Sequence, residues 1–289
     1  MTRTKPTIAD LRARKGKGQL TMLRVMSLDE AAAAEDAGID IVSVPAEIVT
    51  HPRYREVAPT LFSMTGQTHL ESGTRDDYLR WACKVMLAGA DAVYCSGGLG
   101  TVEHVAREHI PVVGHVGLVP SRATWTGGMK AVAKTAQGAM ALLDEVRAYE
   151  AAGAFAVEIE VVPVEVASEI SRRVGILLWS MGAGPGCDAQ YLFAEDILGT
   201  NRGHMPRHSK VYRNFAKEYD RLQAERVAAF REFIADVASS AYPEDKHVIK
   251  MSPQELAAFK AAISANLTEE ETGEKPHAGM DSRLRGNRY

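Results

Sequence analysis

Short apolar runs alternate with longer helical segments along most of this chain, and this alternation constrains the fold more than any other feature. Alternation of this kind is typical of βα units that build a parallel sheet, and eight such units are the number that closes a (β/α)8 barrel. Eight runs rich in β-branched residues are present, and the strands that they predict cover residues 20–26, 39–44, 60–64, 92–95, 112–116, 156–161, 176–180 and 191–194.

The segments between these runs have helical periodicity and predict the outer layer of the barrel. Gly38, Gly89 and Gly153 each follow a predicted helix, where a glycine suits the left-handed residue that ends many helices. The repeated "AGA" and "AGI" phrases are therefore interpreted as helix-to-strand joints rather than as phosphate loops. The predicted helices cover residues 28–37, 75–88, 101–108, 130–152 and 163–174.

Beyond residue 196 the pattern changes to charged amphipathic helices, predicted over residues 210–239 and 253–265. The sequence therefore predicts an α/β protein, a TIM barrel with additional C-terminal helices, over residues 19–267. A basic N-terminal extension, residues 1–18, precedes it. Residues 268–289 are polar, contain glycine and lack periodicity, so we expect a disordered tail.

Composition narrows the classes of partner. The formal net charge is -3, which leaves no excess of lysine and arginine to neutralise a phosphate backbone, so no nucleic-acid partner is expected. The three cysteines are widely spaced and suggest neither a disulfide framework nor a zinc cage, as is typical of the cytoplasm. No segment has the length of a signal peptide or of a transmembrane helix, so no membrane partner is expected.

The active site of a parallel barrel lies at the C-terminal ends of its strands, where this chain carries several polar side chains. Glu160 ends an otherwise apolar strand, and a carboxylate in that position is either paired or functional. Glu158 shares its face by the period of two. The alternative is that both carboxylates face the helical layer and pair there with arginine or lysine.

His115 and Arg24 are the other two prominent candidates. His115 stands among valines and glycines, as a hydrogen-bonded core residue or as a proton donor beside Glu160. Arg24 interrupts a buried strand, so it requires a carboxylate partner, for which Glu47 is nearest, or an anionic ligand. Other polar side chains at predicted strand ends are candidates for substrate binding: Ser27, Glu47, Tyr94 and Ser96.

Several phrases of this chain, in order, resemble the ketopantoate hydroxymethyltransferases (3-methyl-2-oxobutanoate hydroxymethyltransferases). The most specific are "GHVGLVP", "EIEVVP" and "MPRHSKVY", and the resemblance covers residues 19–247. It implies a TIM barrel of the phosphoenolpyruvate/pyruvate superfamily, assembled as a homo-oligomer. It also implies transfer of a hydroxymethyl group from methylenetetrahydrofolate to the enolate of a small α-keto acid, with Mg2+ as a Lewis acid, in pantothenate biosynthesis.

The resemblance places the family's base on Glu160 and its histidine on His115, but the metal end has changed. Two metal-binding aspartates of the family fall on Ala46 and Gly66. A substrate-binding lysine falls on Tyr94 and a carboxylate near the metal on Ser96. Glu47 is the only tentative metal ligand that the first four strand ends offer, so it stays open whether Mg2+ is bound.

Three hypotheses follow from the sequence. The first is a hydroxymethyltransferase-like transferase that forms the enolate of an α-keto acid, with Glu160 as base and His115 at the oxygen. The second is another carbon-carbon lyase or aldolase of the superfamily, with altered or no metal dependence. The third is a catalytically inert barrel that serves as a binding subunit.

Overall fold

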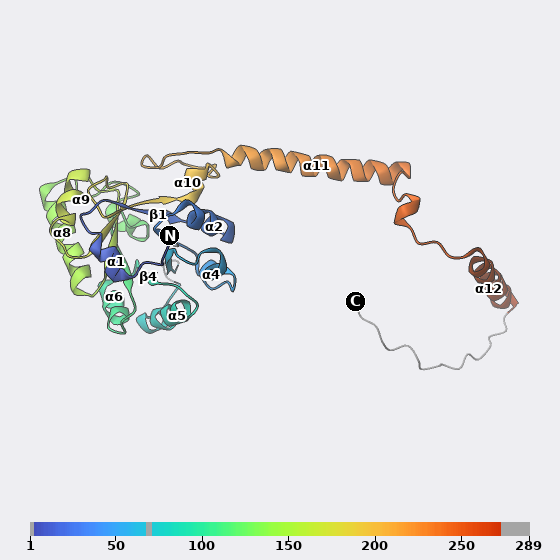
Figure 1. The fold of residues 1–289 in the computed structure, drawn as a ribbon, viewed down its shortest axis with the longest axis horizontal. Coiled ribbons are helices and arrows are strands. Elements are labelled where there is room, and N and C mark those ends of the chain that lie inside the picture. Colours follow the sequence, from blue (N-terminus) through green and yellow to red (C-terminus); the bar gives the residue numbers. More distant parts are fainter. Residues whose placement is uncertain (1–2, 68–70, 273–289) are drawn as a thin grey trace. The chain divides into compact units, whose positions relative to one another are not determined.

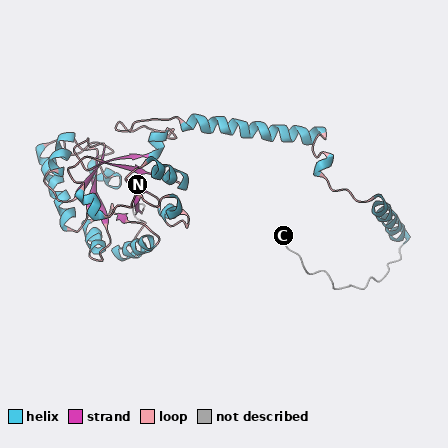
Figure 2. Ribbon diagram, viewed as in Figure 1, coloured by secondary structure: helices cyan, strands magenta, loops and turns pink. Residues whose placement is uncertain are grey.

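The computed structural model describes residues 3–67 and 71–272 (Figure 1). Eight parallel strands form a closed barrel in sequence order, with β8 paired to β1, which confirms the predicted fold. Figure 2 shows helices surrounding these strands. The strands are β1 (Leu20–Arg24), β2 (Ile41–Ser43), β3 (Phe62–Gly66), β4 (Ala92–Tyr94), β5 (Val112–Gly117), β6 (Ala156–Glu160), β7 (Leu177–Met181) and β8 (Ala189–Phe193).

The chain divides into two compact units, Met1–Asp220 and Arg221–Tyr289. The first unit holds the barrel and most of the helices. Its helices are α1 (Ile8–Ala13), α2 (Leu28–Ala37), α3 (Ala46–Val49), α4 (Tyr54–Val57), α5 (Arg75–Leu87), α6 (Leu99–Ala106), η1 (Pro120–Arg122), α7 (Ala123–Thr126), α8 (Ala136–Ala151), α9 (Val164–Ser171) and α10 (Ala194–Leu198).

Two clusters of buried side chains stabilise the barrel. One lies between the strands and the helices, and the other lies inside the barrel. In the inner cluster, Phe155 packs edge-on against Phe62 and Trp179, at centroid distances of 6.0 and 5.7 Å. Phe62 begins β3 and Phe155 immediately precedes β6, so these rings fill the end of the barrel where the strands start. The C-terminal ends of the strands are left for polar side chains.

The predicted basic extension includes a helix that packs on the barrel. Thr7 caps α1 through a reciprocal bond with Asp10, and Leu11 belongs to the inner cluster. Lys15 forms an ion pair of 3.0 Å with the buried carboxylate of Asp188. The basic residues there therefore serve, at least in part, to fix the segment to the strands.

Two predicted helices begin several residues later than expected, and the one predicted from residue 210 begins at Phe215. We predicted a helix from residue 130, but α8 begins at Ala136, because the hydroxyl of Thr135 accepts the backbone N–H of Gly138 and caps the helix. Ala133 has a φ of 56°, which a right-handed helix does not allow.

The second unit contains the rest of α11 (Phe215–Ser239), then η2 (Asp245–His247) and α12 (Pro253–Thr272). All side chains of residues 221–265 are exposed. The disordered tail was predicted from residue 268, but the first five residues of that stretch are helical, and residues 273–289 lie outside the described residues. No described helix combines the length and apolarity that crossing a membrane requires.

Candidate active site

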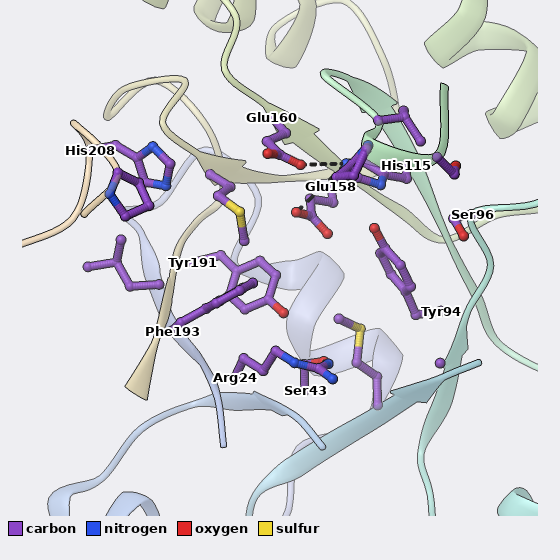
Figure 3. A pocket seen from close by; sticks show the side chains of 18 of the residues that line it. Arg24, Ser43, Tyr94, Ser96, His115, Glu158, Glu160, Tyr191, Phe193 and His208 are labelled. Atoms are coloured by element: carbon purple, nitrogen blue, oxygen red, sulfur yellow. Dashed lines mark hydrogen bonds and ion pairs between the residues drawn. The ribbon is translucent and has the colours of Figure 1, made fainter. Parts of the chain in front are cut away.

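A cavity of about 450 Å³ opens at the C-terminal ends of the strands (Figure 3). Its wall combines residues from all eight strands, so residues far apart in the sequence face one space. Ser96 and His208 line the cavity from segments outside the strands. The polar lining residues within the strands include Arg24, Ser43, Tyr94, His115, Glu158, Glu160 and Tyr191.

His115 and Glu160 form a buried pair in this cavity, with 3.0 Å between His115 Nε2 and Glu160 Oε2. Glu158 Oε1 lies 3.8 Å from the same nitrogen. In the parallel pairing of β5 with β6, His115 is opposite Glu158, and Glu160 follows two residues later on the same face. The two carboxylates therefore face the barrel interior and the histidine, and the predicted alternative, pairing in the helical layer, is wrong.

The close packing of these groups alters their protonation. Burial raises the pKa of Glu158, and the neighbouring Glu160 raises it too, while His115 lowers it. Burial lowers the pKa of His115, but the two carboxylates outweigh burial and raise it overall. The imidazole is therefore biased toward its protonated form, which neutralises part of the negative charge on β6.

The backbone around Glu160 is under local constraint. Gly117 is opposite Glu160 with a φ of 89°, and a Cβ on it would collide with the carbonyl oxygen of Glu160. Val161 has a φ of 49°, which is rare for a β-branched residue and costs about 1–3 kcal/mol. The chain thus turns sharply just after Glu160, which leaves this carboxylate at the mouth of the barrel.

Tyr94 packs beside the pair. Its ring centroid lies 5.7 Å from that of His115, and its hydroxyl points toward Glu158 (Figure 3). Burial raises the pKa of Tyr94 well above its ordinary value, and Glu158 raises it further. The phenol therefore keeps its proton and donates it in a hydrogen bond to Glu158.

Gly66 is directly opposite Tyr94 in the pairing of β3 with β4. A Cβ on Gly66 would lie 3.0 Å from Tyr94 Cδ1 and 3.1 Å from the Tyr94 carbonyl oxygen. A side chain at position 66 and the present position of the Tyr94 ring therefore compete for the same space.

Arg24 occupies the other side of the cavity, where Nη1 donates a hydrogen bond of 3.2 Å to Ser43 Oγ. It forms no ion pair with any described residue. Glu47, its predicted partner, is exposed on α3 and does not line the cavity. The predicted ion pair is wrong because β2 ends at Ser43, so the strand presents Ser43 to Arg24 before the chain turns into α3.

Ser27 does not line the cavity, contrary to its prediction as a substrate-binding residue. It is the N-cap of α2, where its hydroxyl accepts the backbone N–H of Glu30 at 3.1 Å. A serine just after a strand and three residues before a glutamate is a common start of a helix. Ser96 does line the cavity, as predicted from its strand end.

Several polar residues of the cavity were not singled out from the sequence, among them Ser43, Tyr191, His208, Ser121 and Asp196. Ser43 and Tyr191 are inward-facing residues of β2 and β8, and the alternation within those strands is a signal that could have revealed them. His208 lies in the "MPRHSKVY" phrase and packs over Gly182, where a Cβ would lie 2.8 Å from His208 Nδ1. Burial lowers the pKa of His208, and Glu160 opposes this.

The residues present do not fit the magnesium site that the resemblance implies. Ala46 and Gly66 offer no side-chain oxygen, and Glu47 is outside the cavity. Among the described residues, one group has the composition of a cation site: His115, Glu158 and Glu160, whose nearest donor atoms lie within 4.8 Å of one another. An imidazole is a poor ligand for Mg2+, and here it is hydrogen-bonded to Glu160.

Comparison with known proteins places the His115–Glu160 pair within a matched protein family. The family model described as ketopantoate hydroxymethyltransferase matches residues 67–245, which include the His115–Glu160 pair and most of the barrel. The chain belongs to the ketopantoate hydroxymethyltransferase family. The replacement of a family carboxylate at Gly66 and of a family lysine at Tyr94 stays a prediction of the resemblance, and Gly66 lies just outside the matched residues.

Family relatives match over most of their length. A 3-methyl-2-oxobutanoate hydroxymethyltransferase of Pyrobaculum aerophilum is 33% identical over 258 residues, which are 81% of this chain and 95% of the relative. One from Hyperthermus butylicus is 34% identical over 83% of this chain and 89% of the relative. A putative phosphonomutase from Burkholderia cenocepacia has a TM-score of 0.52 at 13% identity, covers 78% of this chain and 98% of its own, and agrees in fold alone.

Proposed function

We propose that this chain is a hydroxymethyltransferase-like enzyme that forms the enolate of a small α-keto acid and adds a one-carbon unit to it. The observation that carries the proposal is the buried His115–Glu160 pair, 3.0 Å apart, at the open end of the barrel. The cavity that this pair faces has a volume of about 450 Å³, which leaves room for a keto acid and part of a second molecule. The membership of the family supports the choice of reaction class.

In this proposal Glu160 removes the proton at C3 of the keto acid. His115, protonated and bonded to Glu160 through Nε2, fixes the orientation of the carboxylate before the transfer. The Tyr94 hydroxyl, which donates to Glu158 in the free protein, turns to the developing enolate oxygen when the keto acid is bound. Hydrolysis of methylenetetrahydrofolate would break its methylene C–N bonds and release formaldehyde, with tetrahydrofolate as the leaving group. The enolate carbon then bonds to the formaldehyde carbon, and the formaldehyde oxygen takes up a proton to complete the hydroxymethyl group.

Proton exchange tests the first chemical step without the second substrate. Wild-type protein with 3-methyl-2-oxobutanoate in deuterated water should exchange the C3 proton, followed by NMR. Glu160→Gln should lower the exchange rate by about 10²–10⁴-fold, the usual contribution of a general base. The exposed Glu165→Gln on α9 is the matched control and should leave the rate unchanged. Absence of exchange in a folded wild-type protein would remove the main support.

A carbon-carbon lyase is the second candidate, because the same base and enolate serve an aldol cleavage. It is favoured by Tyr94 and Ser96, which make the pocket less charged than the family resemblance implies. A lyase would release formaldehyde from a 4-hydroxy-2-oxo acid and would not use methylenetetrahydrofolate as a substrate. If neither exchange nor cleavage is found, and Glu160→Gln simply raises the melting temperature, the chain is an inert barrel with a binding role.

The broader biological setting of the proposal follows from the family alone. Pantothenate biosynthesis, a cytoplasmic location and assembly as a homo-oligomer stay predictions. Residues 19–267 as the catalytic barrel with its C-terminal helices likewise stay a proposal.

A further inference from the structure

The cavity has two chemically different halves. Its β6 side carries Glu158 and Glu160, with His115 beside them. On the side of β1, β2 and β8 the strands supply one charged group, Arg24, and its neighbours are the hydroxyls of Ser43 and Tyr191 (Figure 3). The buried Asp196 of α10 also lines the cavity, but it accepts hydrogen bonds from Asn201 and Ser209. A ligand with an anionic group at one end and an acidic C–H bond at the other would match this separation of charge.

Arg24 is available to bind an anion. It is half-buried, and a guanidinium has five N–H donors. Arg24 donates one hydrogen bond to Ser43 Oγ and another to the Tyr191 hydroxyl, which leaves further donors for a ligand. Burial raises the pKa of Tyr191, while Ser43 and Arg24 lower it, which places the Tyr191 hydroxyl close to both. Arginine binds carboxylates through two parallel hydrogen bonds, and partial burial strengthens such bonds.

The same half of the cavity is unsuited to a divalent cation. The lining residues of β2, β3, β4 and β8 carry no carboxylate, and the guanidinium would repel a metal ion. Position 66 cannot gain a carboxylate while the Tyr94 ring stays where it is, because even a Cβ would approach that ring to 3.0 Å. The positive charge that faces a ligand here is therefore the one that the protein itself supplies.

We propose that the carboxylate of the keto acid binds directly to the Arg24 guanidinium, beside the hydroxyls of Ser43 and Tyr191, and that this binding needs no divalent cation. The inference rests on the proposed function for the choice of ligand. With the carboxylate at Arg24, the rest of the keto acid extends across the cavity toward Glu160, where its C3 proton is removed.

Calorimetric titration of the full chain with 3-methyl-2-oxobutanoate tests this arrangement in three buffers, which contain excess EDTA, excess Mg2+ and excess Mn2+. The Kd should agree within about twofold in the three buffers. Arg24→Gln should weaken binding by about 10–100-fold, since a hydrogen-bonded charge contributes about 1.5–3 kcal/mol. The exposed Arg53→Gln is the matched control and should bind as the wild type does.

The neutral amide of the same acid gives a second readout that needs no variant to fold. It should bind wild-type protein at least tenfold more weakly than the acid. Acid and amide binding equally, Arg24→Gln binding like the wild type, or acid binding that is tenfold tighter with metal would each overturn the inference. Tighter binding with metal would then point to His115, Glu158 and Glu160 as a cation site.

The two proposals fail in different ways. Metal-dependent binding accompanied by C3 exchange overturns the direct role of Arg24 and leaves the proposed function standing. Metal-free binding that depends on Arg24 but is accompanied by no C3 exchange overturns the proposed function and leaves the direct role of Arg24 standing. No binding of the acid in any buffer overturns both.

Discussion

At position 66 the absence of a side chain is a packing requirement of Tyr94. Because a Cβ there would lie 3.0 Å from the Tyr94 ring and 3.1 Å from its carbonyl oxygen, Gly66→Ala should destabilise the fold by about 1–3 kcal/mol. In a Tyr94→Ala background the ring contact is gone while the contacts with the backbone oxygen and Cβ of residue 94 remain, so the cost should fall only in part. Urea unfolding of the four proteins gives this coupling free energy. An equal cost in both backgrounds would mean that the two positions are independent.

Glu158 makes the stability of the fold decrease as the pH rises. The native pKa values of Glu158 and His115 are both raised, from ordinary values of 4.5 and 6.5, so the folded state holds these protons more tightly than the unfolded chain. Each group therefore stabilises the fold fully at pH values below its ordinary pKa, and this stabilisation is lost as the pH rises through the pKa of the group in the folded protein. Glu158→Gln removes the first contribution and weakens the second.

The melting temperature of Glu158→Gln, relative to wild type, should therefore rise between pH 5 and pH 9. A change of about 1 kcal/mol corresponds to about 2–4 °C for a chain of this size. The exposed Glu165→Gln should give a difference that is constant with pH. A constant difference for Glu158→Gln as well would show that its carboxylate titrates normally in the native state.

At the scale of single elements, Ser27 belongs to helix α2 rather than to the site. Ser27→Ala should cost about 1 kcal/mol in the free energy of unfolding, the usual contribution of an N-cap, because the Glu30 N–H loses its acceptor. Ser27→Asp should restore most of it. Keto-acid binding measured by calorimetry should be the same in all three proteins. A higher Kd for Ser27→Ala would mean that Ser27 contributes to ligand binding.

The strands were predictable because each is a short apolar run. All eight overlap the runs that predict them, although β8 begins at Ala189, two residues before its predicted start. Glu160 and His115 followed from the period of two, which fixes the face of a side chain once its strand is known. Glu47 was misplaced because no local pattern marks where β2 ends. Ser43 is the last inward residue of β2, and Pro45 begins the turn into α3, so the side chains beyond it leave the cavity.

The start of α8 and the pairing of Gly66 with Tyr94 were harder to predict for a different reason. Helical periodicity continues through residues 130–135, and only the cap at Thr135 and the backbone of Ala133 interrupt it. The contact between positions 66 and 94 depends on the register of β3 against β4, which neither segment specifies alone.

For the whole molecule, the first compact unit ends at Asp220, and residues 221–265 bury none of their side chains. Arg202 still pairs with Asp220 at 2.5 Å, and Ser209 still donates to the buried Asp196 at 2.6 Å, in a chain that stops at residue 220. We therefore expect residues 1–220 to fold alone, with a melting temperature within about 4 °C of the full chain, a difference of about 1 kcal/mol.

Keto-acid binding should also survive this truncation, since every residue that lines the cavity precedes residue 209. A chain that stops at residue 200 is the contrasting control. It loses His208, the bond from Ser209 to Asp196, and the backbone bond from Tyr212 to Ile197, so it should lose both stability and binding. If the 220-residue chain also unfolds or loses the ligand, the exposed apolar side chains of α11, such as Phe230 and Ile234, stabilise the barrel by an association that the isolated chain does not contain.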